Sequence, residues 1–113
     1  MDIDYFKKIR ILDGGMGQEL LSRGLVTKGT LWSASALLDE KNHQLLIDTH
    51  LSFIDAGAEV ILTNSFTTRR IRFEQNKVNN YFDFANKKAG ELALKAKEIS
   101  KKNILIGGSL PAQ

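Results

Sequence analysis

The chain has 113 residues, of which 42% are hydrophobic and 26% charged, which is typical of one small globular domain and excludes a disordered segment. Its net charge of +3 is too small to indicate a nucleic-acid-binding protein, and the one basic cluster, Arg69, Arg70 and Arg72, is interpreted as solvated surface. The apolar runs are short and the N-terminus lacks the hydrophobic segment of a secretory signal. We therefore expect a cytoplasmic protein with no nucleic-acid or membrane partner.

Three short apolar runs predict the strands of a sheet. They lie in the segments 9–13, 59–64 and 103–108, and polar residues or glycine follow each of them at once. Continuous apolar runs, rather than alternating ones, are typical of strands that are buried on both faces in parallel sheets. We therefore expect three adjacent parallel strands in the order first, second, third.

Apolar residues with helical spacing lie between these runs. They predict a short helix at 18–23 that Gly24 ends, a helix near 42–56 that Asp39 or Asn42 caps and Gly57 ends, and a longer helix near 80–100. The predicted buried faces of the two longer helices share 3- or 4-residue spacing; they are Ile47, Leu51, Ile54 and Ala58, then Ala85, Ala89, Leu92, Ala96 and Ile99. Alternating strands and helices indicate βαβ units, and hence an α/β fold with both helices on one face of the sheet.

The predicted strands end in residues that suit a zwitterionic amino acid. In parallel α/β proteins, ligands gather at the carboxyl ends of the strands. Asp13 can receive an ammonium group, and Gly14 and Gly15 leave backbone N–H groups free for a carboxylate. Asn64 and Ser109 follow the second and third strands and complete the candidate site. The alternative is that the Asp-Gly-Gly run is an ordinary turn; a phosphate loop is excluded, because neither G-x-G-x-x-G nor G-K-[ST] occurs.

Other residues with possible chemical roles carry less information. His43 and His50 are seven positions apart, whereas a metal pair on a helix prefers a spacing of four, so we interpret both as surface or packing residues. Trp32 is interpreted as a buried loop anchor, with the lining of a ligand pocket as the alternative. The chain has no cysteine, which excludes disulfides, thiolate metal sites and a cysteine nucleophile within these residues.

Several segments together resemble the homocysteine S-methyltransferase family. The matching segments are ILDGGMGQEL at 11–20, LWSA at 31–34, AGAEVI at 56–61 with His50 before it, TNSF at 63–66 and IGGSLP at 106–111. They occur in the family's order, with its spacing, and cover nearly the whole chain. One departure is Gln18, which stands where relatives often have threonine.

The resemblance implies a (β/α)8 TIM barrel that transfers a methyl group to the sulfur of homocysteine and so forms methionine, with zinc held by cysteine thiolates. It implies that Asp13 receives the homocysteine amino group, that Gly14 and Gly15 shape the pocket floor, and that Asn64 lies at the metal end. It also implies that Ser109, which follows the third strand, lies in the same substrate site. The methyl donor stays open among S-methylmethionine, betaine and folate-linked cobalamin.

A barrel of this kind takes about 250 residues, so residues 1–113 are expected to form its N-terminal part, about three βα units, truncated after the third strand. The family's cysteines lie in later strands. We therefore expect this chain alone to hold no catalytic residue, bind no zinc, be inactive and self-associate through an exposed sheet edge. The alternatives are a non-catalytic module that binds an amino acid or completes a barrel with a partner chain and, less favoured, a metal-free barrel enzyme using Asp13 as acid or base.

Overall fold

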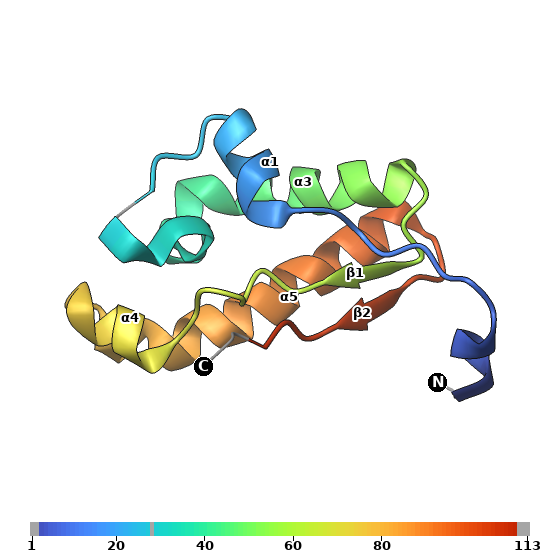
Figure 1. Cartoon of the computed structure of the whole chain (residues 1–113). Coiled ribbons are helices and arrows are strands. Elements are labelled where there is room, and N and C mark those ends of the chain that lie inside the picture. Colours follow the sequence, from blue (N-terminus) through green and yellow to red (C-terminus); the bar gives the residue numbers. More distant parts are fainter. Residues whose placement is uncertain (1–2, 28, 111–113) are drawn as a thin grey trace.

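A short parallel sheet lies against two long helices (Figure 1). The computed structural model describes residues 3–27 and 29–110. Strands β1 (Val60–Leu62) and β2 (Leu105–Gly107) run parallel, with Val60 opposite Leu105 and Leu62 opposite Gly107. The segment 9–13 joins the other edge of β1 through a single parallel bridge between Leu12 and Val60. The predicted order and the parallel direction of the three segments are confirmed.

The first predicted strand is much shorter than expected. The Asp13 N–H donates to the Val60 carbonyl (3.0 Å) and the Ile11 carbonyl accepts from the Glu59 N–H (2.7 Å), but Ile9 is 95% exposed. The prediction that this run is buried on both faces was wrong. Within the described residues the segment has a paired neighbour on one side only, and a strand without a second neighbour leaves its apolar side chains open.

Helix α3 (His43–Asp55) occupies the predicted 42–56 segment and ends as expected. The Gly57 N–H donates to the Ile54 carbonyl and Ala58 to Phe53, while Gly57 takes a φ of +114°, which a residue with a side chain rarely adopts. The predicted cap at Asp39 belongs instead to the preceding 3₁₀ turn η3 (Glu40–Asn42), where its carboxylate accepts from the Lys41 N–H (3.2 Å).

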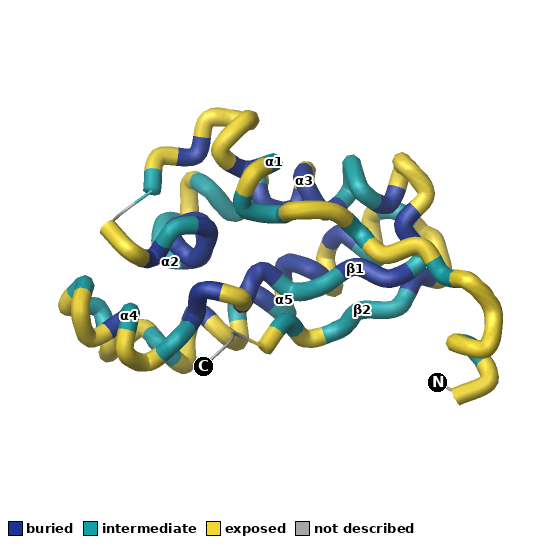
Figure 2. Tube along the Cα trace, viewed as in Figure 1, coloured by how far each residue is buried: buried dark blue, intermediate teal, exposed yellow. Residues whose placement is uncertain are grey.

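Helix α5 (Phe82–Ser100) packs along α3 through small residues. Ala85, Ala89 and Ala96 have no exposed surface, and Leu92 is buried, so the predicted buried face is largely confirmed. Ile99 is the exception, since it is 49% exposed near the end of the helix. Figure 2 shows the buried positions gathered where the helices meet β1, whereas the N-terminal segment is exposed. Alanines allow the two helices to approach closely over the shared core.

The remaining elements are short. Helix α1 (Met16–Ser22) starts two residues before the predicted helix and Gly24 follows it with a φ of +98°. The turns and helices that the sequence did not predict are η1 (Ile3–Lys7), η2 (Gly29–Ala34), α2 (Ser35–Leu38), α4 (Arg70–Gln75) and η4 (Asn79–Tyr81). Apolar periodicity cannot detect elements of one or two turns, because a turn offers too few positions. None of the helices in the described part of the chain has the length and apolar character needed to cross a bilayer.

The arginine cluster is not simply solvated surface. The Arg72 Nη1 donates to the Thr30 carbonyl (2.7 Å) and ties α4 to η2. The Arg70 guanidinium lies 4.3 Å from the centroid of the Phe82 ring. Arg70 is exposed, as the interpretation as solvated surface predicts, although its guanidinium also contacts a ring, whereas Arg72 is only partly exposed and joins two elements of the fold.

Gly14 is fixed by packing, which gives a first prediction. A Cβ at this position would lie 2.9 Å from Cε1 of Phe53, so Gly14→Ala should lower the free energy of unfolding by about 1–3 kcal/mol through overpacking. The matched control is Gly90→Ala within α5, where the new Cβ meets nothing within 4 Å. That change should raise the free energy of unfolding by about 0.5–1 kcal/mol. Urea unfolding measures both, and destabilisation of the same size in each would contradict the packing argument.

His50 gives a second prediction. It is fully buried on α3, neither ring nitrogen has a hydrogen-bond partner within the described residues, and burial lowers its pKa from 6.5 to about 4. The folded chain thus keeps His50 neutral where the unfolded chain protonates it. The free energy of unfolding should therefore be unaffected by His50 above pH 6.5. As the pH falls from 6.5 toward 4, it should decrease by about 3 kcal/mol, because the unfolded chain takes up a proton on His50 that the folded chain does not.

His50→Leu should therefore flatten the fall in unfolding free energy between pH 6.5 and pH 4.5, because leucine has no proton to take up. The control His43→Gln changes a partly exposed histidine on the same helix and should leave the fall in place. Urea unfolding at stepped pH values measures the slope. An unchanged slope in His50→Leu would show that other groups cause the acid sensitivity.

Candidate functional site

A cavity of about 220 Å³ lies at the end of the sheet where the carboxyl ends of the strands meet. All the predicted site residues line it, namely Asp13, Gly14, Gly15, Asn64 and Ser109. They come from three segments that are far apart in the sequence and that parallel pairing brings to the same edge. The prediction that Asp13, Asn64 and Ser109 meet at one end of the sheet is therefore confirmed.

Asp13 is held by the backbone of the neighbouring strand. The Leu62 N–H donates to its Oδ2 (3.0 Å), which fixes the carboxylate in the wall of the cavity. Partial burial raises the pKa of Asp13 above 3.8, and hydrogen bonds from the backbone oppose that rise. A carboxylate that is partly withdrawn from water attracts a cation more strongly than a fully hydrated one, so the position suits an ammonium group.

Asn64 positions a loop. Its side chain is 3% exposed, and its Nδ2 donates to the Ser33 carbonyl (2.9 Å). Thr67 does the same nearby, because its hydroxyl oxygen accepts from the Ala34 N–H (3.0 Å) and donates to the Leu31 carbonyl (2.8 Å). These bonds fasten η2 to the exit of β1 and so set the wall of the cavity.

Hydroxyl groups connect the exits of the two strands. The Ser109 N–H donates to Oγ1 of Thr63 (3.2 Å), which lies 2.7 Å from the Ser65 hydroxyl, and that hydroxyl donates to the Ser109 carbonyl (2.9 Å). The chain after β2 is therefore held beside the exit of β1. Ser109 contributes through its backbone, a contact that a strand-end position in the sequence does not reveal.

Trp32 forms the opposite wall in a strained conformation. Its φ of 48° and ψ of −121° are rare for a residue with a bulky side chain. Its ring lies against Gly17, where a Cβ would come within 2.8 Å of the indole. Trp32 is half-buried and lines the cavity, so the alternative interpretation as the lining of a pocket is confirmed, whereas a fully buried anchor is not observed.

Sequence reasoning did not assign several other residues that line the cavity; these are Met16, Gly17, Ser33, Leu62 and Phe66. Of these residues, only Gly17 could have been assigned to the site from the sequence, because it follows Gly14 and Gly15 in the same segment after a predicted strand. Leu62 and Ser33 serve through backbone groups, for which a sequence carries no signal.

The described residues do not fit a resident metal. Across 3–27 and 29–110, no three His, Cys, Asp or Glu side chains come together as a metal site, and the sequence contains no cysteine. A structural or catalytic zinc needs three or four such ligands.

A parallel α/β sheet whose strand exits line a cavity belongs to the class of α/β proteins that bind ligands at the carboxyl ends of their strands. The family model for homocysteine S-methyltransferase matches residues 10–113. The chain therefore belongs to the homocysteine S-methyltransferase family.

Individual relatives agree with this assignment. The homocysteine S-methyltransferase of Escherichia coli is 35% identical over 91 residues, covering 80% of this chain and 29% of that protein. Homocysteine S-methyltransferase 2 of Zea mays is 32% identical over 96 residues, covering 84% of this chain and 28% of that protein. The chain thus spans about a third or less of the length of these relatives.

Solved structures of one relative superpose well. The crystal structure of the homocysteine methyltransferase MmuM from Escherichia coli matches in its oxidized form with a TM-score of 0.81 and 28% identity, covering 96% of this chain and 39% of that one. Its metallated form matches with a TM-score of 0.78 and 29% identity, covering 93% and 38%.

The contact between Gly17 and Trp32 gives a third prediction. Gly17→Ala should displace the indole and shift its fluorescence emission, because the new Cβ would lie 2.8 Å from the ring. Trp32 is the only tryptophan of the sequence, so the emission reports on this wall alone. Gly108→Ala, where a Cβ meets nothing within 4 Å, is the control and should leave the spectrum unchanged. Identical spectra for Gly17→Ala and the unmodified chain would rule out this packing.

Proposed function

We propose that this chain is the N-terminal part of a homocysteine S-methyltransferase and that its cavity binds the amino-acid end of homocysteine. The observation that carries the proposal is the convergence of Asp13, the Gly14-Gly15 backbone and the exits of β1 and β2 on one cavity in a member of this family. The share of each relative that the chain covers supports a (β/α)8 barrel of which these residues form about three βα units.

In this proposal the residues of this chain bind and orient the substrate. The Asp13 carboxylate receives the ammonium group, and the Gly14-Gly15 backbone faces the carboxylate. Trp32 excludes water from one wall, while Asn64 and Thr67 keep its loop in place. Orienting the substrate in this way converts a bimolecular encounter into a positioned one.

The proposed reaction forms a bond between the homocysteine sulfur and the methyl carbon of the donor. The bond between that carbon and the donor breaks, its electron pair stays with the donor, and the thiol proton of homocysteine is released. The thiolate is the nucleophile, since a thiol with a pKa of about 8.5 is mostly protonated at neutral pH. Because the described residues offer no metal site, the zinc of the proposed enzyme would be held by cysteines outside these 113 residues.

The test joins residues 1–113 to the C-terminal remainder of the Escherichia coli relative. The fusion should produce methionine from homocysteine and contain zinc, whereas the 113-residue chain alone should do neither. Methionine formation with several donors and elemental analysis measure the two properties. A folded fusion that forms no methionine from any donor would contradict the proposal and favour a non-catalytic module.

Asp13→Asn gives a fourth prediction: the substitution should weaken homocysteine binding without lowering the stability of the fold. In the fusion it should raise the homocysteine KM by about 10- to 100-fold, because a charge-assisted contact worth roughly 1.5–3 kcal/mol is lost. Burial raises the pKa of Asp13, so its ionised form costs stability at neutral pH and the neutral asparagine should unfold at an equal or higher urea concentration. Asp55→Asn, at the exposed end of α3, is the control and should change neither. An unchanged homocysteine KM in Asp13→Asn would remove Asp13 from the site.

A further inference from the structure

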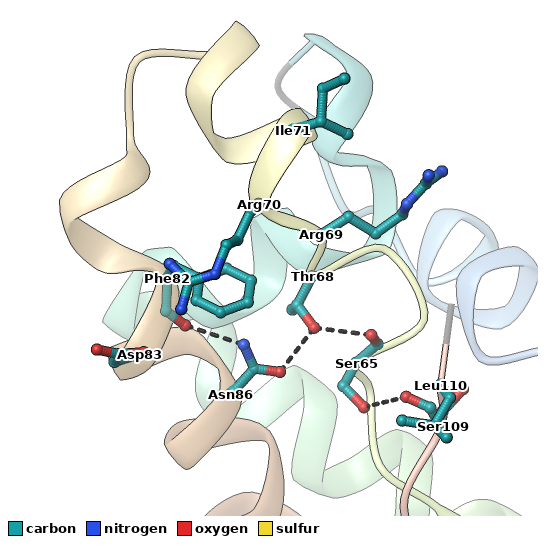
Figure 3. A pocket seen from close by; sticks show the side chains of 10 residues that line it. All are labelled: Ser65, Thr68, Arg69, Arg70, Ile71, Phe82, Asp83, Asn86, Ser109 and Leu110. Atoms are coloured by element: carbon teal, nitrogen blue, oxygen red, sulfur yellow. Dashed lines mark hydrogen bonds between the residues drawn. The ribbon is translucent and has the colours of Figure 1, made fainter. Parts of the chain in front are cut away.

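The beginning of α5 has two faces that line different cavities. Figure 3 shows the residues on one face, near the exit of β1; these are Phe82, Asp83 and Asn86. Residues two positions apart point to opposite sides of a helix, so Phe84 and Lys88 lie on the other face. Together with Tyr81 they line a separate groove of about 380 Å³. The other residues that line this groove are Leu38, Glu40 and His43. The groove therefore lies on the side of α5 that faces away from the strand exits.

Two aromatic rings in this groove are partly open to solvent. Tyr81 is 48% exposed and Phe84 43% exposed, and their rings meet edge to face with the centroids 6.4 Å apart. The Lys88 ammonium group lies 5.5 Å from the Phe84 centroid and forms an ion pair with Glu91 (3.0 Å). Among the described residues, no cation lies over the Tyr81 ring. The Tyr81 ring is thus available to a further cation.

Glu40 adds a carboxylate to the same groove. It is exposed, and none of the salt bridges between residues that the structure describes includes it. The lysine that follows it, Lys41, pairs with Asp39 instead (3.5 Å). His43 adds a second acceptor, because its Nε2–H donates to the Leu37 carbonyl (2.9 Å), which leaves Nδ1 of the neutral ring to accept. The groove therefore combines a negative charge and hydrogen-bond acceptors with aromatic rings.

The N-terminal part of the chain contains a complete unit of similar composition. The Arg10 guanidinium lies 3.8 Å from the centroid of the Tyr5 ring and forms an ion pair with Glu59 (3.1 Å). One guanidinium can serve both partners, since its flat face stacks on a ring while its edge donates hydrogen bonds to a carboxylate. The groove holds the same two residue types, Tyr81 and Glu40, but the described residues that line it include no arginine. A compact, strongly hydrated ammonium group matches this pair less well.

From these contacts we propose that the groove binds a partner protein through an arginine side chain, which stacks on Tyr81 and pairs with Glu40. Apolar residues next to that arginine pack on Leu38 and Phe84. Exposed ion pairs and cation–π contacts are individually weak, so a free guanidinium compound gains little binding, whereas a polypeptide adds apolar contacts. The inference does not depend on the proposed methyl transfer, because the groove and the strand exits lie on opposite sides of α5.

Two capped pentapeptides test this inference. One has an arginine between leucines, and the other has citrulline in its place, which keeps the shape of the side chain without the charge. Titration of each peptide into the ¹⁵N-labelled 113-residue chain, followed by NMR, measures both affinities and shows which amides respond. The arginine peptide should bind about 5- to 10-fold more tightly, the gain expected for an exposed ion pair together with a cation–π contact. The shifts should gather at residues 38–43 and 81–88.

Substitutions in the groove should remove this preference for arginine. Glu40→Gln and Tyr81→Leu should each reduce it to about threefold or less, because each removes one partner of the guanidinium. Tyr81→Phe keeps an aromatic ring and should retain the preference. Glu98→Gln, the same change of charge at an exposed position near the other end of α5, is the control and should also retain it.

Equal binding of the two peptides, or a preference for arginine that survives Glu40→Gln, would overturn the inference. Equal affinities for acetyl-arginine amide and for the arginine peptide would overturn the assignment to a polypeptide and favour a small guanidinium ligand. Analytical ultracentrifugation completes the test. Self-association of the chain that Glu40→Gln abolishes would overturn the assignment to a separate protein and favour a second copy of this chain.

Discussion

The pairing of β1 with neighbours on both edges is the constraint on which the rest of the structure depends. Val60 pairs with Leu12 on one side and with Leu105 on the other, and both pairings are parallel. This register places Asp13 opposite the end of β1, where the Leu62 N–H can hold its carboxylate. A slip of one residue would turn Leu62 and its neighbours to the opposite face and separate the residues that line the cavity.

Most polar side chains near the cavity build it rather than face a ligand. Asn64 and Thr67 hold the loop of Trp32, and Thr63 with Ser65 holds the chain after β2. Buried hydroxyl and amide groups without partners are costly, so these internal bonds also stabilise the strand exits. The Asp13 carboxylate stands apart, because it keeps a charge available at the wall of the cavity.

Three positions carry an energetic cost that packing elsewhere must offset. Trp32 has an unfavourable backbone conformation, Asp13 is a partly buried carboxylate, and His50 is buried without a hydrogen-bond partner among the described residues. Two of the three lie at the cavity, where strain and desolvation accompany binding sites in many proteins. His50 lies in the helical core instead, so its cost appears in the response of stability to acid.

The sequence alone determined the parallel α/β arrangement, because buried strands and amphipathic helices have different apolar periods, and it placed Asp13, Gly14, Gly15, Asn64 and Ser109 at strand ends. Tertiary structure decided the rest. The segment 9–13 forms one bridge rather than a strand, since regular pairing needs a neighbour that no local pattern supplies. The fit of Gly17 to Trp32, the stacking of Arg70 on Phe82 and the loop-holding bond of Asn64 join residues distant in sequence. Such contacts depend on the packed geometry of several elements, which periodicity and residue type do not encode.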